Sequence, residues 1–316
     1  MTVLMLLGLA ALGLAVLTVA ADQLVLGAGR LATMLRIAPV VVGVIVIGLG
    51  TSAPEFVVSG IAAARGDVGL AAGNLIGSNI LNLTMVLGIA ALVAPIAVRS
   101  STVRREAPLS VAATVAFAGA VAFGLGPLAG AGLAVAMLLT AVLLVHLARA
   151  SAGPAIPPGA DDPPQRRRGT TMARETARTV LGLLGTLLGA QLLVENASVL
   201  AARLGVPQVI IGLTLVAIGT SLPELVTAVQ AQRRGASDLL VGNLLGSNLF
   251  NSLTGGAIVG LLGGHRPVDA GPAILLAMVL VALLAWALLG RGHRVTRTDA
   301  YLLLGAYLLS LPLLAA

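Results

Sequence analysis

The sequence predicts an all-α integral membrane protein, with ten transmembrane helices arranged as two inverted five-helix repeats. The first observation is composition: the 316 residues are 58% hydrophobic and 10% charged, with a mean hydropathy of +1.04. Soluble domains carry about 25% charged residues. The second is that two polar motifs occur twice, 169 positions apart. The third is that the arginines gather on one side of the predicted spans.

The apolar runs set the number of spans, because a membrane helix needs roughly 20 apolar residues. Runs bounded by charges or by Pro and Gly predict spans at 3–28, 38–64, 70–95, 107–124, 128–148, 178–201, 207–232, 239–262, 271–290 and 300–315. The halves 1–148 and 175–316 therefore hold five spans each. The segment between them, 149–174, is rich in proline and charge, which is typical of a polar linker.

The first twenty residues resemble a secretory signal peptide but lack a basic amino-terminal region. Residues 21–43 also align with residues 190–212 at the same offset of 169 positions. A segment that belongs to a repeat is expected to remain in the protein. We therefore expect 3–28 to be the first transmembrane helix.

Arginine placement predicts the orientation. If the linker is cytoplasmic, sixteen of the nineteen arginines lie on the cytoplasmic side and only Arg65, Arg203 and Arg266 lie outside. Both termini then lie outside the cytoplasmic membrane. Because each half has an odd number of spans, the second half enters from the opposite side, which is typical of many secondary transporters.

Composition also excludes several classes of function. The chain has no cysteine, which excludes disulfides, thiolate metal sites and a cysteine nucleophile. The net charge of +7 comes from loop arginines on one side of a membrane, so no nucleic-acid partner is expected. No His or Lys lies at helical spacing from Ser52 or Ser221, so no base is evident for a serine enzyme. We expect no enzyme, no catalytic residue and no cofactor.

The repeated motifs carry the chemistry. Gly-Thr-Ser-x-Pro-Glu at 50–55 returns at 219–224, and Gly-Asn-Leu-x-Gly-Ser-Asn at 73–79 returns at 242–248. Asn82 returns as Asn251. A carboxylate at hydrocarbon depth is expensive, and by default it indicates function.

The spacing places the polar groups of each motif on one helix face. Gly48, Thr51, Ser52 and Glu55 are three and four residues apart, so they share a face. Pro54 should kink or open the helix near Gly50, which frees carbonyl groups. Asn74, Ser78 and Asn82 follow at intervals of four, and the second half repeats the pattern with Ala217, Thr220, Ser221, Glu224, Asn243, Ser247 and Asn251.

These groups predict one cation site built from both halves. The donors are oxygens only, which suits Ca²⁺, Na⁺ or Mg²⁺ and disfavours zinc or copper. Glu55 and Glu224 together neutralise one divalent ion or two monovalent ions, as an exchanger with a shared site requires. Helix packing is an equally good interpretation for each serine or asparagine taken singly. For Asp22 and Glu195 we expect helix-end or interfacial roles rather than ligand roles.

The paired motifs resemble the two α-repeats of the cation/Ca²⁺ exchanger superfamily, and most closely those of the prokaryotic sodium/calcium antiporters. The resemblance covers nearly the whole chain. It implies four cation sites near the midplane and alternating access, in which the first and sixth spans slide across a fixed core. It also implies that Na⁺ and Ca²⁺ are the transported ions and that a monomer is sufficient.

The resemblance further implies a role for each matching residue. Glu55 and Glu224 are the central ligands; Thr51, Ser52, Ser78, Thr220, Ser221 and Ser247 supply further oxygens; Gly48 and Ala217 offer carbonyls; Asn82 and Asn251 line the middle site. Some archaeal members carry Asp at the position of Asn251, so the proton dependence and stoichiometry stay open. The leading interpretation is Na⁺-driven Ca²⁺ export. Proton-coupled or other-cation exchange is the alternative, and a passive cation channel is disfavoured.

Overall fold

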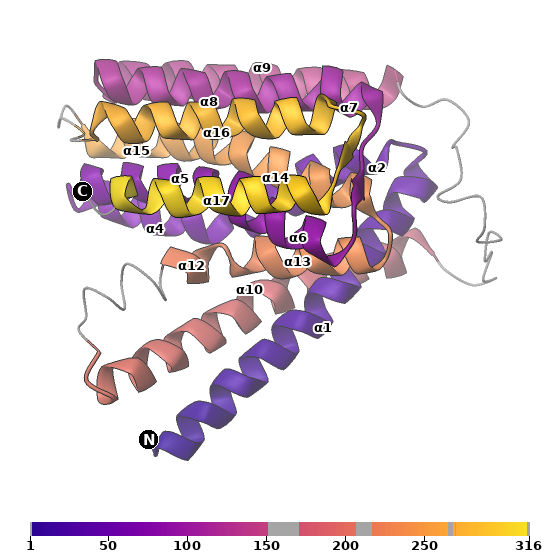
Figure 1. The fold of residues 1–316 in the computed structure, drawn as a ribbon, viewed down its shortest axis with the longest axis horizontal. Coiled ribbons are helices and arrows are strands. Elements are labelled where there is room, and N and C mark those ends of the chain that lie inside the picture. Colours follow the sequence, from indigo (N-terminus) through magenta and orange to yellow (C-terminus); the bar gives the residue numbers. More distant parts are fainter. Residues whose placement is uncertain (1, 151–170, 207–216, 265–267, 269, 315–316) are drawn as a thin grey trace.

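The structure is a computed structural model that describes residues 2–150, 171–206, 217–264, 268 and 270–314. Figure 1 shows long helices that run side by side across the molecule and two helices that slant away from them. The predicted linker 149–174 lies largely outside the described residues, as does the start of the predicted span 207–232.

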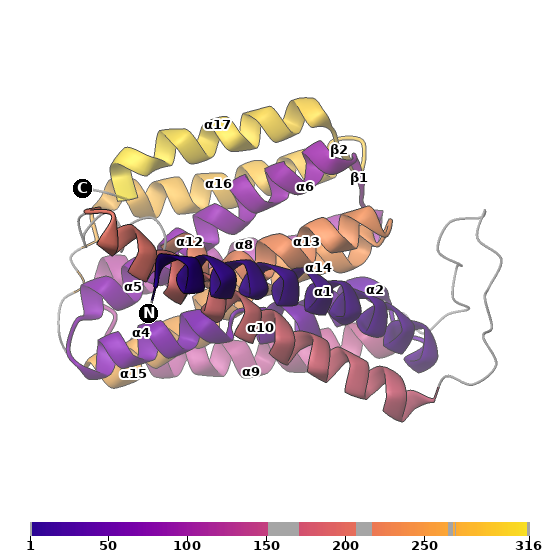
Figure 2. The same cartoon turned by 90° about the horizontal axis from the view of Figure 1, so that it is seen from below.

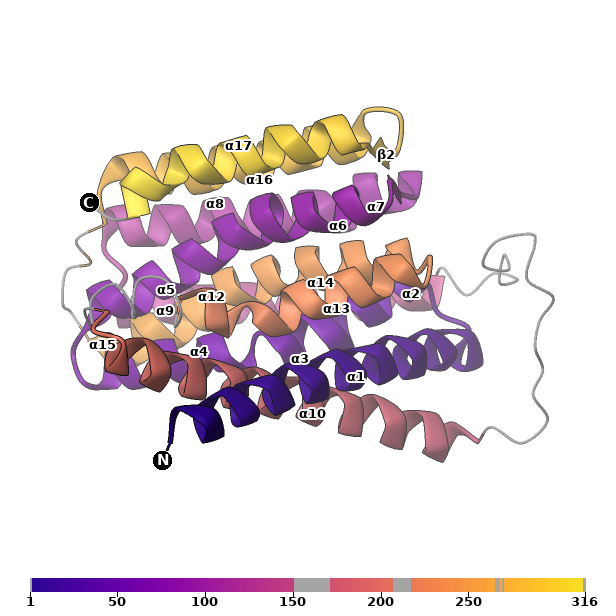
Figure 3. The same cartoon turned by 60° about the horizontal axis from the view of Figure 1, so that its bottom comes forward.

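The two slanted helices are α1 (Val3–Leu35) and α10 (Met172–Arg203), and they pack along one another (Figures 1 and 3). Glycines make this close approach possible. A Cβ atom on Gly182 would lie 2.6 Å from the backbone nitrogen of Leu24, and one on Gly13 would lie 2.6 Å from that of Leu193. Small residues let membrane helices approach to backbone contact. The result is a tightly packed helix pair, the α1–α10 unit.

Each half of the chain has a motif region, the segment that carries the repeated motifs. In the first half this region is divided into several short helices. It begins with α2 (Pro39–Val42), the π-helix η1 (Gly43–Gly48), α3 (Leu49–Thr51) and α4 (Ala53–Ala64). The chain then returns through α5 (Val68–Leu81), the π-helix η2 (Asn82–Val86) and α6 (Leu87–Val93). The bend between α3 and α4 measures 44°. It centres on Ser52, two residues beyond the expected position near Gly50, because Pro54 sits in the first turn of α4.

The second half repeats this arrangement. It contains α12 (Ala217–Thr220), α13 (Leu222–Arg233), α14 (Ser237–Phe250), the π-helix η4 (Asn251–Gly255) and α15 (Gly256–Gly263). Ser221 breaks the helix before Pro223 just as Ser52 does before Pro54. Both η2 and η4 begin at the repeated asparagine, Asn82 and Asn251. The sequence repeat is therefore also a repeat of helix breaks.

The remaining helices surround this central region. They are α7 (Ser100–Arg104), α8 (Glu106–Phe123), α9 (Pro127–Ala150), α16 (Pro272–Gly290) and α17 (Arg297–Leu314). Figures 2 and 3 show α16 and α17 on one side and α1 with α10 on the other, with α13 and α14 between them. One departure from the all-α prediction is an antiparallel pair of two-residue strands, β1 (Ile96–Ala97) and β2 (Arg294–Val295).

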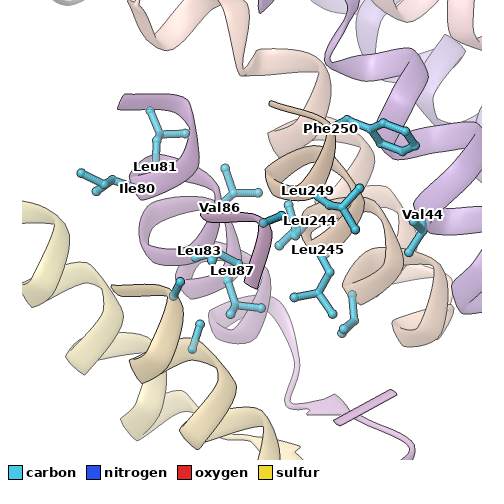
Figure 4. Packing of buried hydrophobic residues seen from close by; sticks show 14 of the residues in the cluster. Val44, Ile80, Leu81, Leu83, Val86, Leu87, Leu244, Leu245, Leu249 and Phe250 are labelled. Atoms are coloured by element: carbon cyan, nitrogen blue, oxygen red, sulfur yellow. The ribbon is translucent and has the colours of Figure 1, made fainter. Parts of the chain in front are cut away.

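Buried aliphatic side chains fill the space between the two motif regions. In Figure 4, Leu83, Val86 and Leu87 lie near Leu244 and Leu245 of α14. Close backbone contact supplements this packing, since a Cβ atom on Gly246 would lie 2.6 Å from the Cα atom of Val44. Residues that crowd this way leave little freedom for the helices to shift relative to one another. The motif segments are thus held by a rigid core.

The helices confirm a multi-pass membrane protein but do not establish ten spans. In the described part of the chain, six helices are long and apolar enough to cross a membrane, or seven if the bent pair α2–α3 and α4 counts as one. Helical segments nevertheless occupy every predicted span outside 207–216. The arginine-bearing ends of α1, α13 and α16 and the starts of α10 and α17 lie toward the same end of the molecule (Figure 1).

Candidate cation-binding site

The two predicted carboxylates lie inside the protein. Glu55 is in the first turn of α4 and Glu224 is in the first turn of α13, and the exposed fraction of each is 0%. Each helix begins there because a serine breaks the chain and a proline follows in the first turn. The repeated Ser-x-Pro-Glu sequence therefore places a carboxylate directly beside a helix break.

Serine hydroxyls from both halves converge on each carboxylate. The Oε1 atom of Glu55 accepts hydrogen bonds from Ser78 at 3.4 Å and from Ser221 at 3.2 Å. The hydroxyls of Ser221 and Ser78 are themselves 3.5 Å apart. Ser78 belongs to the same half as Glu55, whereas Ser221 belongs to the other half. One carboxylate is thereby bonded to both repeats.

Glu224 has the equivalent pair of donors. Its Oε1 atom accepts from Ser247 at 3.5 Å and from Ser52 at 3.3 Å. Ser247 again comes from the same half, and Ser52 comes from the other half. The structure thus brings six of the predicted site residues together in one crossed network: Glu55, Glu224, Ser52, Ser78, Ser221 and Ser247.

The second oxygen of each carboxylate has no protein partner. Oε2 of Glu55 and Oε2 of Glu224 are both buried without a hydrogen bond. A buried polar atom left this way is costly unless something else satisfies it. In the described part of the chain, no three His, Cys, Asp or Glu side chains gather at one place. Two carboxylates, with a formal charge of −2, therefore define the electrostatics of the site.

Backbone and hydroxyl groups of the first half border this network. The carbonyl of Gly48, the last residue of η1, lies 3.3 Å from the Ser247 hydroxyl, whose single hydrogen is shared between this carbonyl and Oε1 of Glu224. Thr51 donates to Oδ1 of Asn243 at 3.2 Å and is fully buried. The Gly48 carbonyl and the Thr51 hydroxyl, two of the predicted oxygen ligands, thus face the other half of the molecule.

The repeated asparagines lie next to this network along the same helices. Asn82 and Asn251 are 1% and 0% exposed, and neither amide group has a hydrogen-bond partner on its nitrogen or its oxygen. Four unsatisfied amide atoms in one buried region are unusual. That Asn82 and Asn251 line a polar site stays a prediction, and their unpartnered amide atoms leave both side chains able to contact an ion.

The two remaining predicted residues lie on α12. Thr220 ends this helix, directly before the break at Ser221, and is partly buried. Ala217 is the first residue of this helix. Residues 207–216, which precede Ala217 and complete the predicted span, are outside the described part of the chain.

Ser59, Asn74 and Asn243 were missing from the predicted ligand set. The Asn74 amide donates to the Ser59 hydroxyl at 3.0 Å and to the Glu55 carbonyl at 3.4 Å. Ser59 in turn donates to the Ala71 carbonyl at 3.0 Å. The signal was present in the sequence, because Ser59 follows Glu55 by four residues and so shares its helix face.

The arrangement can bind cations through oxygen only. Carboxylates, hydroxyls, amide oxygens and a backbone carbonyl converge, whereas no imidazole or thiol is among them. Hard cations such as Ca²⁺ and Na⁺ prefer this donor set. Since the donors come from two halves of the chain, a bound ion would join the halves.

Comparison with known proteins identifies the family. The sequence profile described as "Sodium/calcium exchanger protein" matches residues 5–150 and 175–315. The chain belongs to the sodium/calcium exchanger family. The two matched segments coincide closely with the predicted halves 1–148 and 175–316, and the unmatched segment between them falls within the predicted linker.

Individual relatives resemble this exchanger over nearly its full length. It is 37% identical to the putative antiporter CaxA of Alkalimonas amylolytica, with 94% of each chain covered. It is 34% identical to the inner membrane protein YrbG of Escherichia coli, covering 96% of this chain and 94% of YrbG. The structure of the sodium-calcium exchanger NCX_Mj soaked with Na⁺ superposes with a TM-score of 0.84 at 29% identity, covering 98% and 99% of the two chains. Family membership places this exchanger among cation/Ca²⁺ antiporters, which are transporters rather than enzymes.

Proposed function

We propose that the protein exchanges Na⁺ for Ca²⁺ across the cytoplasmic membrane by alternating access. The observation that carries the proposal is the crossed network, in which each buried glutamate accepts a hydroxyl from its own half and one from the other half. An ion bound there is held by both halves. A movement of one part of the molecule relative to another therefore changes the access to the ion, as exchange requires.

The proposed ligand set is the one predicted from the sequence. Glu55 and Glu224 neutralise Ca²⁺ or two Na⁺ ions, and the free Oε2 atoms of both offer the first ligands. Ca²⁺ takes 6–8 oxygen ligands. Further oxygens would come from Thr51, Ser52, Ser78, Thr220, Ser221 and Ser247, from the carbonyls of Gly48 and Ala217, and from Asn82 and Asn251. Without a cation the two carboxylates are costly to move through the membrane, which favours obligatory exchange.

The proposed topology has ten spans in two inverted five-helix repeats, 1–148 and 175–316. The linker 149–174 is cytoplasmic and both termini lie outside. The repeated order of helix breaks in α3–η2 and α12–η4 supports this arrangement. The gathering of arginine-bearing helix ends at one end of the molecule supports the orientation. One chain supplies one complete site, so a monomer is sufficient.

Proton-coupled or other-cation exchange is the alternative. It is favoured by the same two Oε2 atoms, because an unpartnered carboxylate oxygen can bind a proton as well as a metal ion. Asn251, a buried uncharged residue where some archaeal members carry Asp, leaves the proton dependence open. The choice between Na⁺ and H⁺ therefore depends on the relative affinity of the two carboxylates for these ions.

The deciding experiment measures ⁴⁵Ca²⁺ uptake into proteoliposomes loaded with Na⁺. The outward Na⁺ gradient is imposed or abolished at constant pH, and a pH gradient is then applied without Na⁺. We expect uptake only with the outward Na⁺ gradient. Uptake driven by the pH gradient alone would establish the proton-coupled alternative, and uptake under neither gradient would overturn Ca²⁺ as the substrate.

A further inference from the structure

An ion pair outside the cation site joins the α1–α10 unit to the rest of the protein. Arg234, which follows α13, donates to both carboxylate oxygens of Asp22 in α1, from Nε and from Nη2, each at 2.6 Å. This paired geometry is the strongest form of an arginine–carboxylate contact. The two side chains are 36% and 28% exposed, so water screens the pair in part.

The α1–α10 unit has its own internal ion pairs at the same end. Glu175 of α10 is fully buried and lies 3.1 Å from Arg30 of α1 and 3.0 Å from Arg178 of α10. This cluster ties α1 to α10 but does not reach the core. Of the described ion pairs, only Asp22–Arg234 connects α1 with a motif helix, because α13 also carries Glu224.

The repeat has no equivalent ion pair at its other end. At the offset of 169 positions, Arg234 corresponds to Arg65 and Asp22 corresponds to Gln191. Arg65 and Gln191 are both exposed, and none of the described ion pairs includes Arg65. The arginine is therefore present at both ends, whereas its acidic partner is present at only one.

We infer that the Asp22–Arg234 pair is a latch that holds the α1–α10 unit against α13 in one of the two transport conformations, and so biases the exchanger toward that conformation. This inference rests on the proposed inverted repeat and alternating access. In that scheme the two ends exchange their contacts as the unit moves. The Asp22–Arg234 pair then separates, and at the corresponding position Arg65 meets the neutral Gln191 in place of an aspartate.

The absence of cysteine makes the test direct, because two introduced cysteines are the only labelling sites. Spin labels at Leu12 of α1 and Val57 of α4, which are 52% and 58% exposed, report the distance between the α1–α10 unit and the core. We expect Asp22→Asn to reduce the ratio of the described conformation to the other by about threefold to tenfold, as for partly exposed pairs. The charge-swapped variant, Asp22→Arg with Arg234→Asp, should restore it.

Two further variants sharpen the test. Gln191→Glu supplies an acidic partner for Arg65 in the other conformation. It should therefore also lower the ratio, because it stabilises that other conformation. Arg99→Gln removes an ion pair of 2.9 Å with Asp238 that does not involve α1 or α10, and should leave the ratio unchanged. An unchanged ratio in Asp22→Asn, or failure of the swap to restore it, would overturn the latch. Failure of wild-type ⁴⁵Ca²⁺ exchange would instead overturn the proposed function, since the distance measurement needs no transport.

Discussion

The two halves of the site provide the same carboxylate but surround it differently. Glu55 and Glu224 have equivalent hydroxyl donors and equivalent free oxygens. Their neighbouring asparagines differ. The Asn74 amide nitrogen is held by Ser59, whereas the amide nitrogen of Asn243 has no partner and Ala228 stands at the position that corresponds to Ser59. The two halves therefore give the glutamates the same hydrogen-bond partners, but they differ in the residues that contact the neighbouring asparagines.

A second difference lies in the backbone beside the carboxylates. Gly48 packs so closely that a Cβ atom would lie 2.9 Å from the carbonyl oxygen of Asn243 and 2.9 Å from the nitrogen of Ser247. The second half carries Ala217 at the corresponding position. The first half thus requires glycine at a position where the second half carries alanine. These two differences can be tested separately from the symmetric centre.

The largest effect is expected at the centre, where the halves should behave alike. Glu55→Gln and Glu224→Gln each keep the side-chain shape but remove one of the two charges that bind the ion. Each should lower Na⁺-driven ⁴⁵Ca²⁺ exchange by at least about a hundredfold, which corresponds to roughly 2.7 kcal/mol. Abundance in the membrane should not change.

The matched control is Glu195→Gln in the exposed part of α10, which removes a carboxylate away from the crossed network. It should leave exchange close to that of wild type. Near-normal exchange by either central variant would show that the two carboxylates do not share the ion, and the symmetric interpretation of the site would be wrong.

The next effect is expected from Gly48→Ala, which tests the backbone asymmetry between Gly48 and Ala217. The added methyl group would collide with the backbone of α14, and overpacking of this kind costs about 1–3 kcal/mol. It should lower the thermal stability and weaken exchange through displacement of the Gly48 carbonyl. Thermal unfolding in detergent and ⁴⁵Ca²⁺ uptake measure the two effects. Gly132→Ala is the control, because a Cβ atom there meets nothing within 4 Å, and equal stability losses in both would contradict the prediction.

The sequence predicted the centre of the site better than its surroundings. Charged and hydroxyl groups repeated at one spacing are rare in an apolar chain, so the sequence alone indicates Glu55, Glu224 and the four serines as candidate site residues. The pairing of Ser52 with Glu224 could not be deduced, because it depends on how the halves cross in space. Nor could the π-helices, since local sequence does not distinguish them from an α-helix.

The fold shows the same division. Hydropathy placed helices at every predicted span that the structure describes, because apolar length is a local property. Within the described residues, six helices are long and apolar enough to cross a membrane, or seven if the bent pair counts as one, and the helices at 217–233, 237–263 and 297–314 are not among them. Proline predicted the break near Gly50 but missed its centre at Ser52 by two residues, since a proline is best accommodated in the first turn of the following helix.

A smaller effect is expected when a third carboxylate is introduced. Asn251→Asp and Asn82→Asp place a carboxyl group where four amide atoms lack partners. Each should alter the Na⁺ or proton dependence of Ca²⁺ uptake by more than it alters abundance in the membrane. Uptake measured across a series of Na⁺ concentrations and pH values compares the two positions. An unchanged dependence in both variants would mean that these asparagines only pack. A change in one variant alone would show that the two halves also differ at the asparagine positions.

The smallest effect, and the sharpest test of the asymmetry, concerns Ser59 and Ala228. Ser59→Ala leaves the Asn74 amide nitrogen with only its 3.4 Å contact to the Glu55 carbonyl. A lost hydrogen bond of this kind costs roughly 1 kcal/mol, so the apparent Ca²⁺ affinity should fall about fivefold. Ala228→Ser offers a hydroxyl to the unpartnered nitrogen of Asn243 and should not weaken binding. If Ser59→Ala left the Ca²⁺ affinity unchanged, ion binding would not depend on the hydrogen bond from Asn74 to Ser59. If Ala228→Ser weakened binding as much as Ser59→Ala, the free nitrogen of Asn243 would itself be a requirement of the second half, and the asymmetry would be part of how ions bind.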